Sequence, residues 1–576
     1  MPRKTSTRWT LTAPDERETP YRDRRYNPAT MLRTIAVVFG LAVTPILAGA
    51  QGHEMGPMAA QIFAELGGQH RPITTKVTLA QRYFDQGLNL VYAFNHDEAV
   101  RSFAEAAKKD PSCAICYWGV AYASGPHINN PTMDAGHVKA AWDAVQKAKM
   151  LAAKASPVER DLIDALASRY SPDPQADRLP LDKAYVDAMR GAWSRHPKDA
   201  DVGALFAEAA MDQHPWDLWT QDGKPQPWTG EIVATLEAVL SLNPNHPAAN
   251  HFYIHAVEGS PSPERAVASA DRLAAGLVPG AGHLVHMPGH VYQRVGRYED
   301  AAEANRKAIV VDDKYVAKSP GQGFYLMYKA HNHQFLAFSA MAEGRSEEAT
   351  RAALAMVAQF SPEMLREMAA FMDGSVSLPE FVLVRFGKWS DILGRPAPDP
   401  VLKASTALWH WARGQAFAAT GKLLDADGEL AEVARSAASL DEKAPVGFNS
   451  AKVVVGIASD LLAGELALKR GQTDVGILRL EAAVAGEDSI RYNEPSDWPV
   501  PTRHYLGAAL LAAGRADRAE AVYREDLRRN PENGWSLAGL AAALKQKGAM
   551  PESDGAAARF QKAWSRADVK LTASRF

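Results

Sequence analysis

Eight of the 17 histidines of this chain lie between residues 246 and 333, a far higher density than an even spread would give. Five of them stand three or four residues from a neighbouring histidine, and on a helix these spacings place side chains on one face. These five are His251, His255, His283, His286 and His290. Imidazoles that converge from adjacent helices bind divalent transition metals such as Zn, Cu, Fe or Ni. The pattern therefore predicts a metal site.

Two further residues extend this candidate site. Glu258 lies three residues after His255, and His331 follows in a later segment. Glu258 could be a metal ligand or the general base of a metal-assisted reaction. Two other interpretations stay open. The histidines could hydrogen-bond a peptide carboxylate or a polar small molecule, or they could be satisfied side chains of the core. For His331 and His333, a solvated helix start is a further alternative.

Pro288 interrupts the histidine pattern between His286 and His290. Inside a helix, proline removes a backbone donor and kinks the axis. If the helix instead begins at Pro288, then His283 and His286 lie in the entering loop. The spacing alone does not decide between these arrangements.

A tryptophan-rich insertion, DQHPWDLWTQDGKPQPW, occupies residues 212–228. Its prolines and glycine predict a loop, because these residues break helices. Trp216, Trp219 and Trp228 could form a lid over a binding groove, with Trp216 and Trp219 lining that groove. They could equally pin the loop against neighbouring helices, and the large area that aromatic rings bury favours this pinning role.

The only two cysteines form a C-x-x-C pair, Cys113 and Cys116. Tyr117 follows in place of histidine, which argues against covalent haem attachment. No second C-x-x-C is present to complete a four-thiolate zinc site. We expect a local disulfide, or two small core residues, rather than redox catalysis.

An apolar run from Ile35 to Leu47 lies near the N-terminus. Its length, about 13 residues, falls short of the ~20 that a membrane-spanning helix needs. The small residues Ala48 and Ala50 follow at the spacing that a signal peptidase accepts. We predict a signal peptide that begins near Met31 and is cleaved after Ala50. The mature protein would then be periplasmic or secreted, without stable membrane insertion.

Repeated helix pairs are the elements that must position these side chains. The clearest unit spans residues 283–313, where two amphipathic segments flank a turn. Its marker residues are Gly289, Tyr292, Gly296, Ala301 and Ala308. Comparable units centre on Ala99, Ala266, Ala349, Ala426, Gly464 and Ala519. This pattern resembles the tetratricopeptide repeat over most of residues 79–548, and the whole chain resembles an exported bacterial tetratricopeptide-repeat protein. The resemblance implies an all-α fold of helical hairpins forming a right-handed solenoid, with a concave groove for a partner.

The same resemblance assigns the histidines to that groove. Counting back 18, 15, 11 and 8 residues from Ala301 gives His283, His286, His290 and Gln293. In tetratricopeptide arrays this stripe of the first helix lines the concave surface. The stripe before Ala266 holds His251, His255 and Glu258. We expect Gln293 and His333 to line the groove as well.

The repeats and their interruptions give a division of the chain. We expect an upstream segment and signal peptide at 1–50, an N-terminal extension at 51–78, helical repeats with the Trp-rich insertion at 79–245, His-rich repeats at 246–362, an irregular connector at 363–403 and C-terminal repeats at 404–576. Breaks rich in proline also predict loops at 171–180, 372–400 and 487–501.

Composition narrows the function. With 64 Lys and Arg against 67 Asp and Glu, the formal charge of -3 gives nucleic-acid binding little electrostatic support. Phosphate-loop, nucleophile-elbow and H-E-x-x-H signatures are missing from the sequence. The favoured hypothesis is an exported scaffold that binds a peptide, protein or envelope partner, with a bound transition metal as an additional feature. The alternative is a His-rich metalloenzyme, an oxidoreductase or hydrolase. The sequence makes no firm enzyme assignment.

Overall fold

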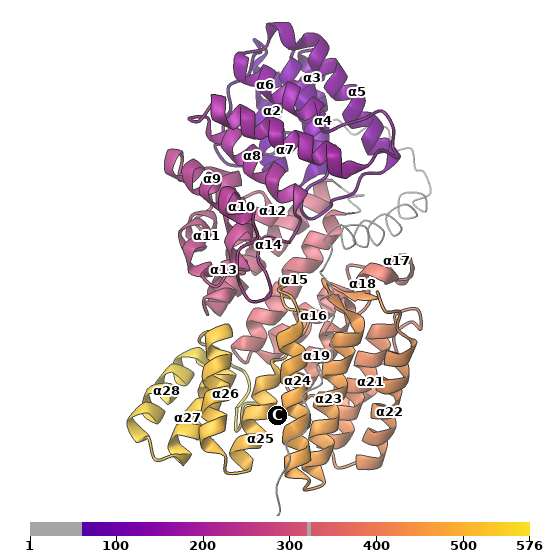
Figure 1. Ribbon diagram of the computed structural model, residues 1–576, viewed down its shortest axis with the longest axis vertical. Coiled ribbons are helices and arrows are strands. Elements are labelled where there is room, and N and C mark those ends of the chain that lie inside the picture. The colour runs from indigo at the N-terminus through magenta and orange to yellow at the C-terminus, as the bar shows by residue number, and fades with distance from the viewer. Residues whose placement is uncertain (1–59, 320–323) are drawn as a thin grey trace, which may run out of the picture.

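The computed structural model describes residues 60–319 and 324–576, and the predicted signal peptide lies outside these ranges. The described chain is almost entirely helical, and successive helices pack as antiparallel pairs (Figure 1). Its one small sheet pairs β1 (Pro445–Val446) with β2 (Asn449–Ser450) in antiparallel register. No helix in the described ranges is both long enough and apolar enough to cross a membrane.

The N-terminal half forms the upper part of Figure 1. Its helices are α2 (Thr78–Tyr92), α3 (His96–Lys109), α4 (Ala114–Ala123), α5 (Ala135–Leu151), α6 (Pro157–Ala167), α7 (Arg178–Arg195), α8 (Ala200–Gln213), α9 (Thr229–Leu242), α10 (Pro247–Glu258), α11 (Val267–Ala274), α12 (Gly282–His286), α13 (Pro288–Arg294) and α14 (Tyr298–Lys318). Two 3₁₀ turns, η1 (Ala152–Lys154) and η2 (Pro263–Ala266), join neighbouring helices.

The middle of the chain connects the two halves. It comprises α15 (Tyr325–Ala342), α16 (Ser346–Val357), α17 (Pro362–Glu367), α18 (Ala369–Met372), η3 (Ser375–Ser377), α19 (Leu378–Arg385) and α20 (Trp389–Gly394). The expectation of an unbroken loop at 372–400 was therefore wrong, because α19 and α20 form there. Pro379 takes the first turn of α19, where its missing N–H has no helical partner to lose.

The C-terminal half consists of regular helical hairpins. Its helices are α21 (Lys403–Ala419), α22 (Leu423–Ser439), α23 (Ala451–Lys469), α24 (Thr473–Ser489), α25 (Thr502–Ala512), α26 (Ala516–Arg529), α27 (Gly534–Gln546) and α28 (Met550–Ala563). Between α24 and α25 the chain forms a loop at residues 490–501, here called the 490–501 loop.

The packing of these hairpins is that of tetratricopeptide-type repeats. The marker alanines of the second helices are fully buried, because only a methyl group fits where two helices approach closely. They are Ala99, Ala266, Ala301, Ala349, Ala426 and Ala519. The chain thus has an all-α fold of stacked helical hairpins, as the sequence pattern predicted.

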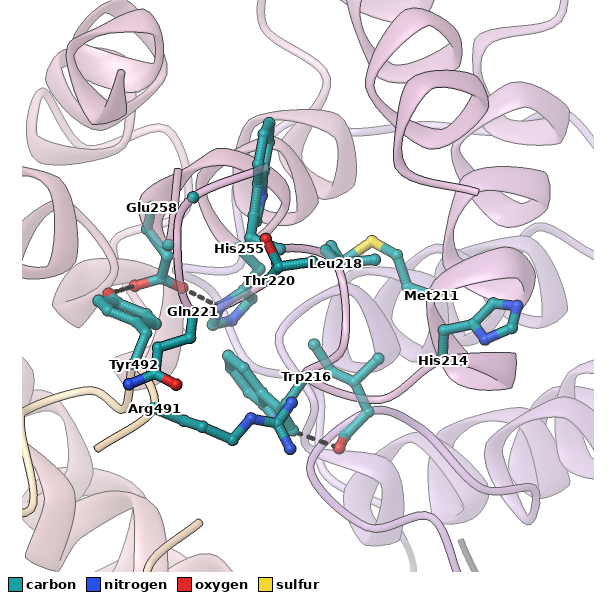
Figure 2. A pocket seen from close by; sticks show the side chains of 14 residues that line it. Met211, His214, Trp216, Leu218, Thr220, Gln221, His255, Glu258, Arg491 and Tyr492 are labelled. Atoms are coloured by element: carbon teal, nitrogen blue, oxygen red, sulfur yellow. Dashed lines mark hydrogen bonds and ion pairs between the residues drawn. The ribbon is translucent and has the colours of Figure 1, made fainter. Parts of the chain in front are cut away.

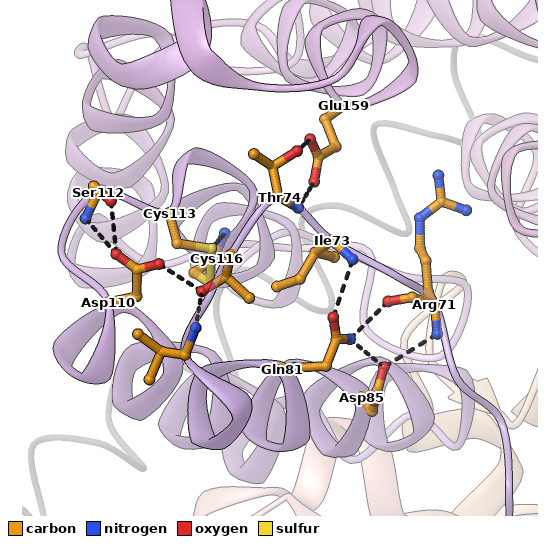
Figure 3. Close-up of a disulfide and its surroundings, with 12 residues drawn as sticks. Arg71, Ile73, Thr74, Gln81, Asp85, Asp110, Ser112, Cys113, Cys116 and Glu159 are labelled. Atoms are coloured by element: carbon orange, nitrogen blue, oxygen red, sulfur yellow. Dashed lines mark hydrogen bonds between the residues drawn. A yellow bond between two sulfur atoms is a disulfide. The ribbon is translucent and has the colours of Figure 1, made fainter.

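A disulfide joins Cys113 and Cys116 at the start of α4, in agreement with the expected local bridge (Figure 3). Both residues are fully buried. Nearby, Thr75 donates a hydrogen bond to Asp110 over 2.5 Å, which ties the segment before α2 to the end of α3.

Candidate metal centre

Four helices of the central region bring the predicted histidines together. His251 and His255 come from α10, His283 and His286 from α12, His290 from α13 and His331 from α15. The first five are buried, and His331 is partly buried. The expectation that they line a concave groove was wrong for His251, His283, His286 and His290, because neighbouring helices and the 490–501 loop cover them, whereas His255 lines the edge of a pocket.

The backbone break at Pro288 helps this convergence. A short helix, α12, ends at His286, and α13 begins at Pro288. His283 and His286 therefore lie on a helix of their own rather than in a loop. His331 lies well inside α15, so the alternative of a solvated helix start was wrong.

One group of ligand atoms contains His251, His255 and His283, here called the His251 triad. Its potential ligand atoms all lie within 4.8 Å of one another. The Nε2 atoms of His251 and His283 are 3.0 Å apart. Two nitrogens bound to one tetrahedral Zn²⁺ at about 2.0–2.1 Å are about 3.3–3.4 Å apart, so this pair lies near the spacing that a metal imposes.

A second group contains His286, His290 and His331, here called the His286 triad. The Nε2 atoms of His286 and His290 are 2.6 Å apart. The ring of Phe335 lies against all three histidines, at centroid distances of 4.9, 4.5 and 5.0 Å. The ring of Phe94 similarly contacts the other triad.

Glu258 joins the two triads. Its Oε1 accepts from His255 Nδ1 at 2.7 Å, and its Oε2 accepts from His290 Nδ1 at 2.8 Å. Tyr492 of the 490–501 loop donates to the same Oε2 at 2.9 Å. Glu494 of this loop forms an ion pair with His290 Nδ1 and lies 3.8 Å from His255 Nδ1. Four carboxylate and imidazole groups thus meet: His255, Glu258, His290 and Glu494.

Sequence reasoning missed Glu494 and Tyr492. Both lie in a break between repeats, more than 230 residues along the chain from Glu258. No periodicity relates them to the histidines. Asn449 holds the loop in place, since its side chain accepts from the Arg491 backbone N–H at 2.7 Å and donates to Asp497 at 2.7 Å.

Hydrogen bonds at Nδ1 fix the tautomers of the key histidines. His251 Nδ1 lies 2.7 Å from the carbonyl oxygen of Tyr92, which can only accept. His286 Nδ1 lies 2.7 Å from Asn305 Oδ1, and Asn305 uses its amide nitrogen to donate to Ala301 O. Each Nδ1 must therefore carry the hydrogen, which leaves the Nε2 lone pair free toward the neighbouring imidazole. Metal-binding histidines are commonly oriented in this way.

The charges follow from this geometry. Burial opposes ionisation of His290, but Glu494 and Glu258 outweigh it and raise the pKa of His290 to about 10. Burial also works against the Glu258 carboxylate, but the charge of His290 and the bonds from His255 and His290 hold the Glu258 pKa well below its usual range. Burial lowers the pKa of His251, His283 and His286 well below 6.5, so these rings are neutral, as metal ligands must be.

Two strained residues border the cluster. Phe94 and Trp216 have φ values of 54° and 57°, in the left-handed region that side chains other than glycine rarely adopt. The Phe94 ring contacts His251 at 4.5 Å, and the Trp216 ring contacts His255 at 5.1 Å. Such strain costs on the order of 1–3 kcal/mol and tends to occur at functional sites.

A pocket opens onto one edge of the cluster (Figure 2). Including its open mouth, it encloses about 740 Å³. His255 and Glu258 line its inner end with Tyr492, and Trp216 and Trp219 form part of its wall. A small molecule entering this pocket would meet the edge of the histidine cluster.

The tryptophans are held as the pinning interpretation predicts. The indole N–H groups of Trp216, Trp219 and Trp228 donate to backbone oxygens of Ile128, Ala256 and Asp217 at 3.1, 2.8 and 2.7 Å. Trp216 and Trp219 nevertheless also line the pocket, so pinning and lining are combined.

The two other predicted groove residues lie outside the ligand groups. Gln293 is on α13 and partly buried, and His333 is on α15 and partly buried. Neither belongs to a group of potential metal ligands within the described ranges.

Comparison with known proteins returns helical-repeat proteins at low similarity. A human IFIT1 dimer with m7Gppp-AAAA is 12% identical with a TM-score of 0.31, covering 85% of this chain and 91% of that chain. The APC/C hetero-tetramer Cut9–Hcn1 is 14% identical with a TM-score of 0.29, covering 95% and 83%. The P58(IPK) TPR domain is 14% identical with a TM-score of 0.19, covering 84% and 92%. No family model and no curated protein matches the chain. Likeness of this strength says nothing about ligands or partners.

Proposed function

We propose that this protein is a metalloprotein in which a tetratricopeptide-like scaffold holds a divalent transition metal at its buried histidine cluster. The observation that carries the proposal is the contact between His286 Nε2 and His290 Nε2 at 2.6 Å. Both Nδ1 atoms face acceptors, so the two Nε2 atoms face each other across this gap, and His290, whose pKa is raised to about 10, holds a proton there when no metal is bound. A metal ion bound at this position would displace that proton and take both Nε2 atoms as ligands.

The surroundings favour a metal in this position. Three neutral or neutralisable imidazoles suit Zn, Cu, Fe or Ni. Glu258 lies behind the ligands and orients His255 and His290, as carboxylates do around metal-bound histidines. Its low pKa and three donors fit this orienting role better than the role of a general base.

Elemental analysis tests this proposal. Tag-free protein would be purified from its natural compartment and its metal content measured beside that of a His286→Ala, His290→Ala variant. A His137→Ala variant is the control, because His137 is exposed, pairs with Asp134 and belongs to none of the ligand groups found in the described ranges. We expect stoichiometric metal in wild type and control, and loss in the double variant. Absence of metal from wild type, also after incubation with Zn²⁺, Cu²⁺, Fe²⁺ or Ni²⁺, would overturn the proposal.

Partner binding is a second candidate function. The helical-repeat scaffold is consistent with binding of a peptide or protein partner, although the metal proposal has the more specific support. A pull-down with the intact protein in its own extract, followed by measured affinity for any recovered partner, tests this function.

Export is proposed as well. The Cys113–Cys116 disulfide supports it, because such bonds persist mainly in oxidising compartments. Mass spectrometry of the mature protein should find Gln51 as its first residue. An N-terminus at Met1 or Met31 would contradict cleavage after Ala50.

A further inference from the structure

We infer that the cluster is a two-metal centre, with one ion in the His251 triad and one in the His286 triad. This inference rests on the proposed metal function and adds the number and arrangement of the ions. Each triad offers three imidazoles, which is the ligand set of a catalytic zinc site that keeps an open position.

The first argument is the arrangement of the ring nitrogens. In five of the six histidines Nδ1 lies beside an oxygen acceptor, which directs Nε2 toward the centre of its triad. The acceptor is Tyr92 for His251, Asn305 for His286 and Gln334 for His331. Glu258 is the acceptor for both His255 and His290.

The second argument is unused coordination capacity in the His251 triad. His255 Nε2 is buried without a hydrogen-bond partner. Buried polar nitrogens normally have partners, because an unsatisfied one costs roughly 1–3 kcal/mol. In the His286 triad, by contrast, the Nε2 atoms of His286 and His290 face each other at 2.6 Å. Each triad therefore has its own position at which imidazole nitrogens could hold an ion.

The third argument is the division of the aromatic surroundings. Phe94 packs on His251, His255 and His283, at centroid distances of 4.5, 6.1 and 5.4 Å. Phe335 packs on the other three histidines. Each triad therefore has its own apolar wall, which limits water access and shapes the coordination space.

Glu258 lies between the two positions and contacts one histidine of each. Its Oε1 bonds His255 and its Oε2 bonds His290. A single carboxylate thus sets the ring orientation on both sides. The pocket is lined by His255 and by no histidine of the His286 triad, so an ion in the His251 triad would lie nearer to molecules that enter it.

Metal stoichiometry of site-specific variants tests the inference. Full mature protein would be stripped with a chelator, reconstituted with Zn²⁺, desalted and analysed. We expect two equivalents in wild type and one in each of His283→Ala and His331→Ala. His410→Ala is the control, because His410 in α21 pairs with Glu429 of α22 and lies in neither triad.

The same measurement distinguishes failure of the two-metal inference from failure of the proposed metal function. One equivalent in wild type, lost in both variants, would overturn the two-metal inference and leave the metal function standing. No bound Zn²⁺ in wild type, with none of the other metals bound, would remove both. His283→Gln and His331→Gln keep side-chain volume, and circular dichroism of all variants separates loss of ligand from loss of fold. Two equivalents remaining in folded variants of both triads would also overturn the inference.

Discussion

Tyr492 Oη donates a hydrogen bond of 2.9 Å to Glu258 Oε2, across a separation of 234 residues. Through this contact the C-terminal half completes a site whose histidines all belong to the first 331 residues. Tyr492 is itself exposed, and its hydroxyl reaches Glu258 beside Glu494, which pairs with His290. The loop between two C-terminal helices is therefore part of the candidate metal centre.

Removal of this hydroxyl should weaken metal binding. In Tyr492→Phe, Glu258 loses one of its three donors and holds His255 and His290 less firmly. We expect metal affinity to fall about tenfold, as for other outer-shell partners, measured by competition with a chromophoric chelator. Tyr253→Phe is a matched control, because Tyr253 lies on α10, the helix that carries Glu258, and donates to Glu237 at 2.7 Å, away from the cluster. Equal losses in both variants would contradict the prediction.

Trp216 should report on metal in the triad nearest the pocket. Its ring lies 5.1 Å from that of His255. Cu²⁺ quenches indole fluorescence at short range, so adding Cu²⁺ to metal-free protein should reduce the emission. Trp216→Phe should remove a large part of this change, whereas Trp409→Phe in α21 should leave it intact. A quench that persists unchanged without Trp216 would place the ion elsewhere.

Sequence reasoning reached the fold and the histidines for the same physical reason. Marker alanines recur because two helices meet at a fixed place in every repeat, and their register located His283, His286 and His290 on one stripe. The repeat register did not predict that these histidines are buried, because the position of a side chain on a helix does not show which other segments cover it. It also missed Glu494, since a carboxylate in a loop carries no periodic signal.

The repeat packing should be sensitive to a single methyl group. The Tyr523 ring lies between Gly507 and Gly539, and a Cβ at these positions would stand 2.4 and 2.2 Å from Tyr523 Cζ. Gly507→Ala should therefore lower the free energy of unfolding by about 1–3 kcal/mol, the usual cost of overpacking. Gly428→Ala in α22 is the control, for which we expect a change in stability of the opposite sign. Its Cβ meets nothing within 4 Å, so it should stabilise by roughly 0.5–1 kcal/mol. Chemical denaturation of both variants measures these changes.

The disulfide should contribute to stability and not to metal binding. Cys113 and Cys116 enclose a very short loop, for which the chain-entropy estimate is about 2 kcal/mol. A Cys113→Ala, Cys116→Ala variant should unfold at lower temperature and retain the metal content of wild type. Loss of metal in a folded variant would show that the pair has a role beyond a local bridge.

Glu487 should make stability depend on pH. Burial raises its pKa to about 7, against a usual value of 4.5, although Thr502 donates to it and Arg503 lies near. Because the folded state holds the proton more tightly, the unfolding free energy is highest below pH 4.5 for this group and declines as pH rises to about 7. The decline is at most about 3 kcal/mol, at 1.36 kcal/mol per pKa unit.

Glu487→Gln keeps an oxygen for Thr502 and cannot ionise, so it should be more stable than wild type at pH 8 and similar at pH 5. Thermal unfolding at both pH values measures the difference, with Glu432→Gln, at a partly exposed position, as control. Parallel pH profiles for Glu487→Gln and wild type would show that this carboxyl ionises normally in the folded protein.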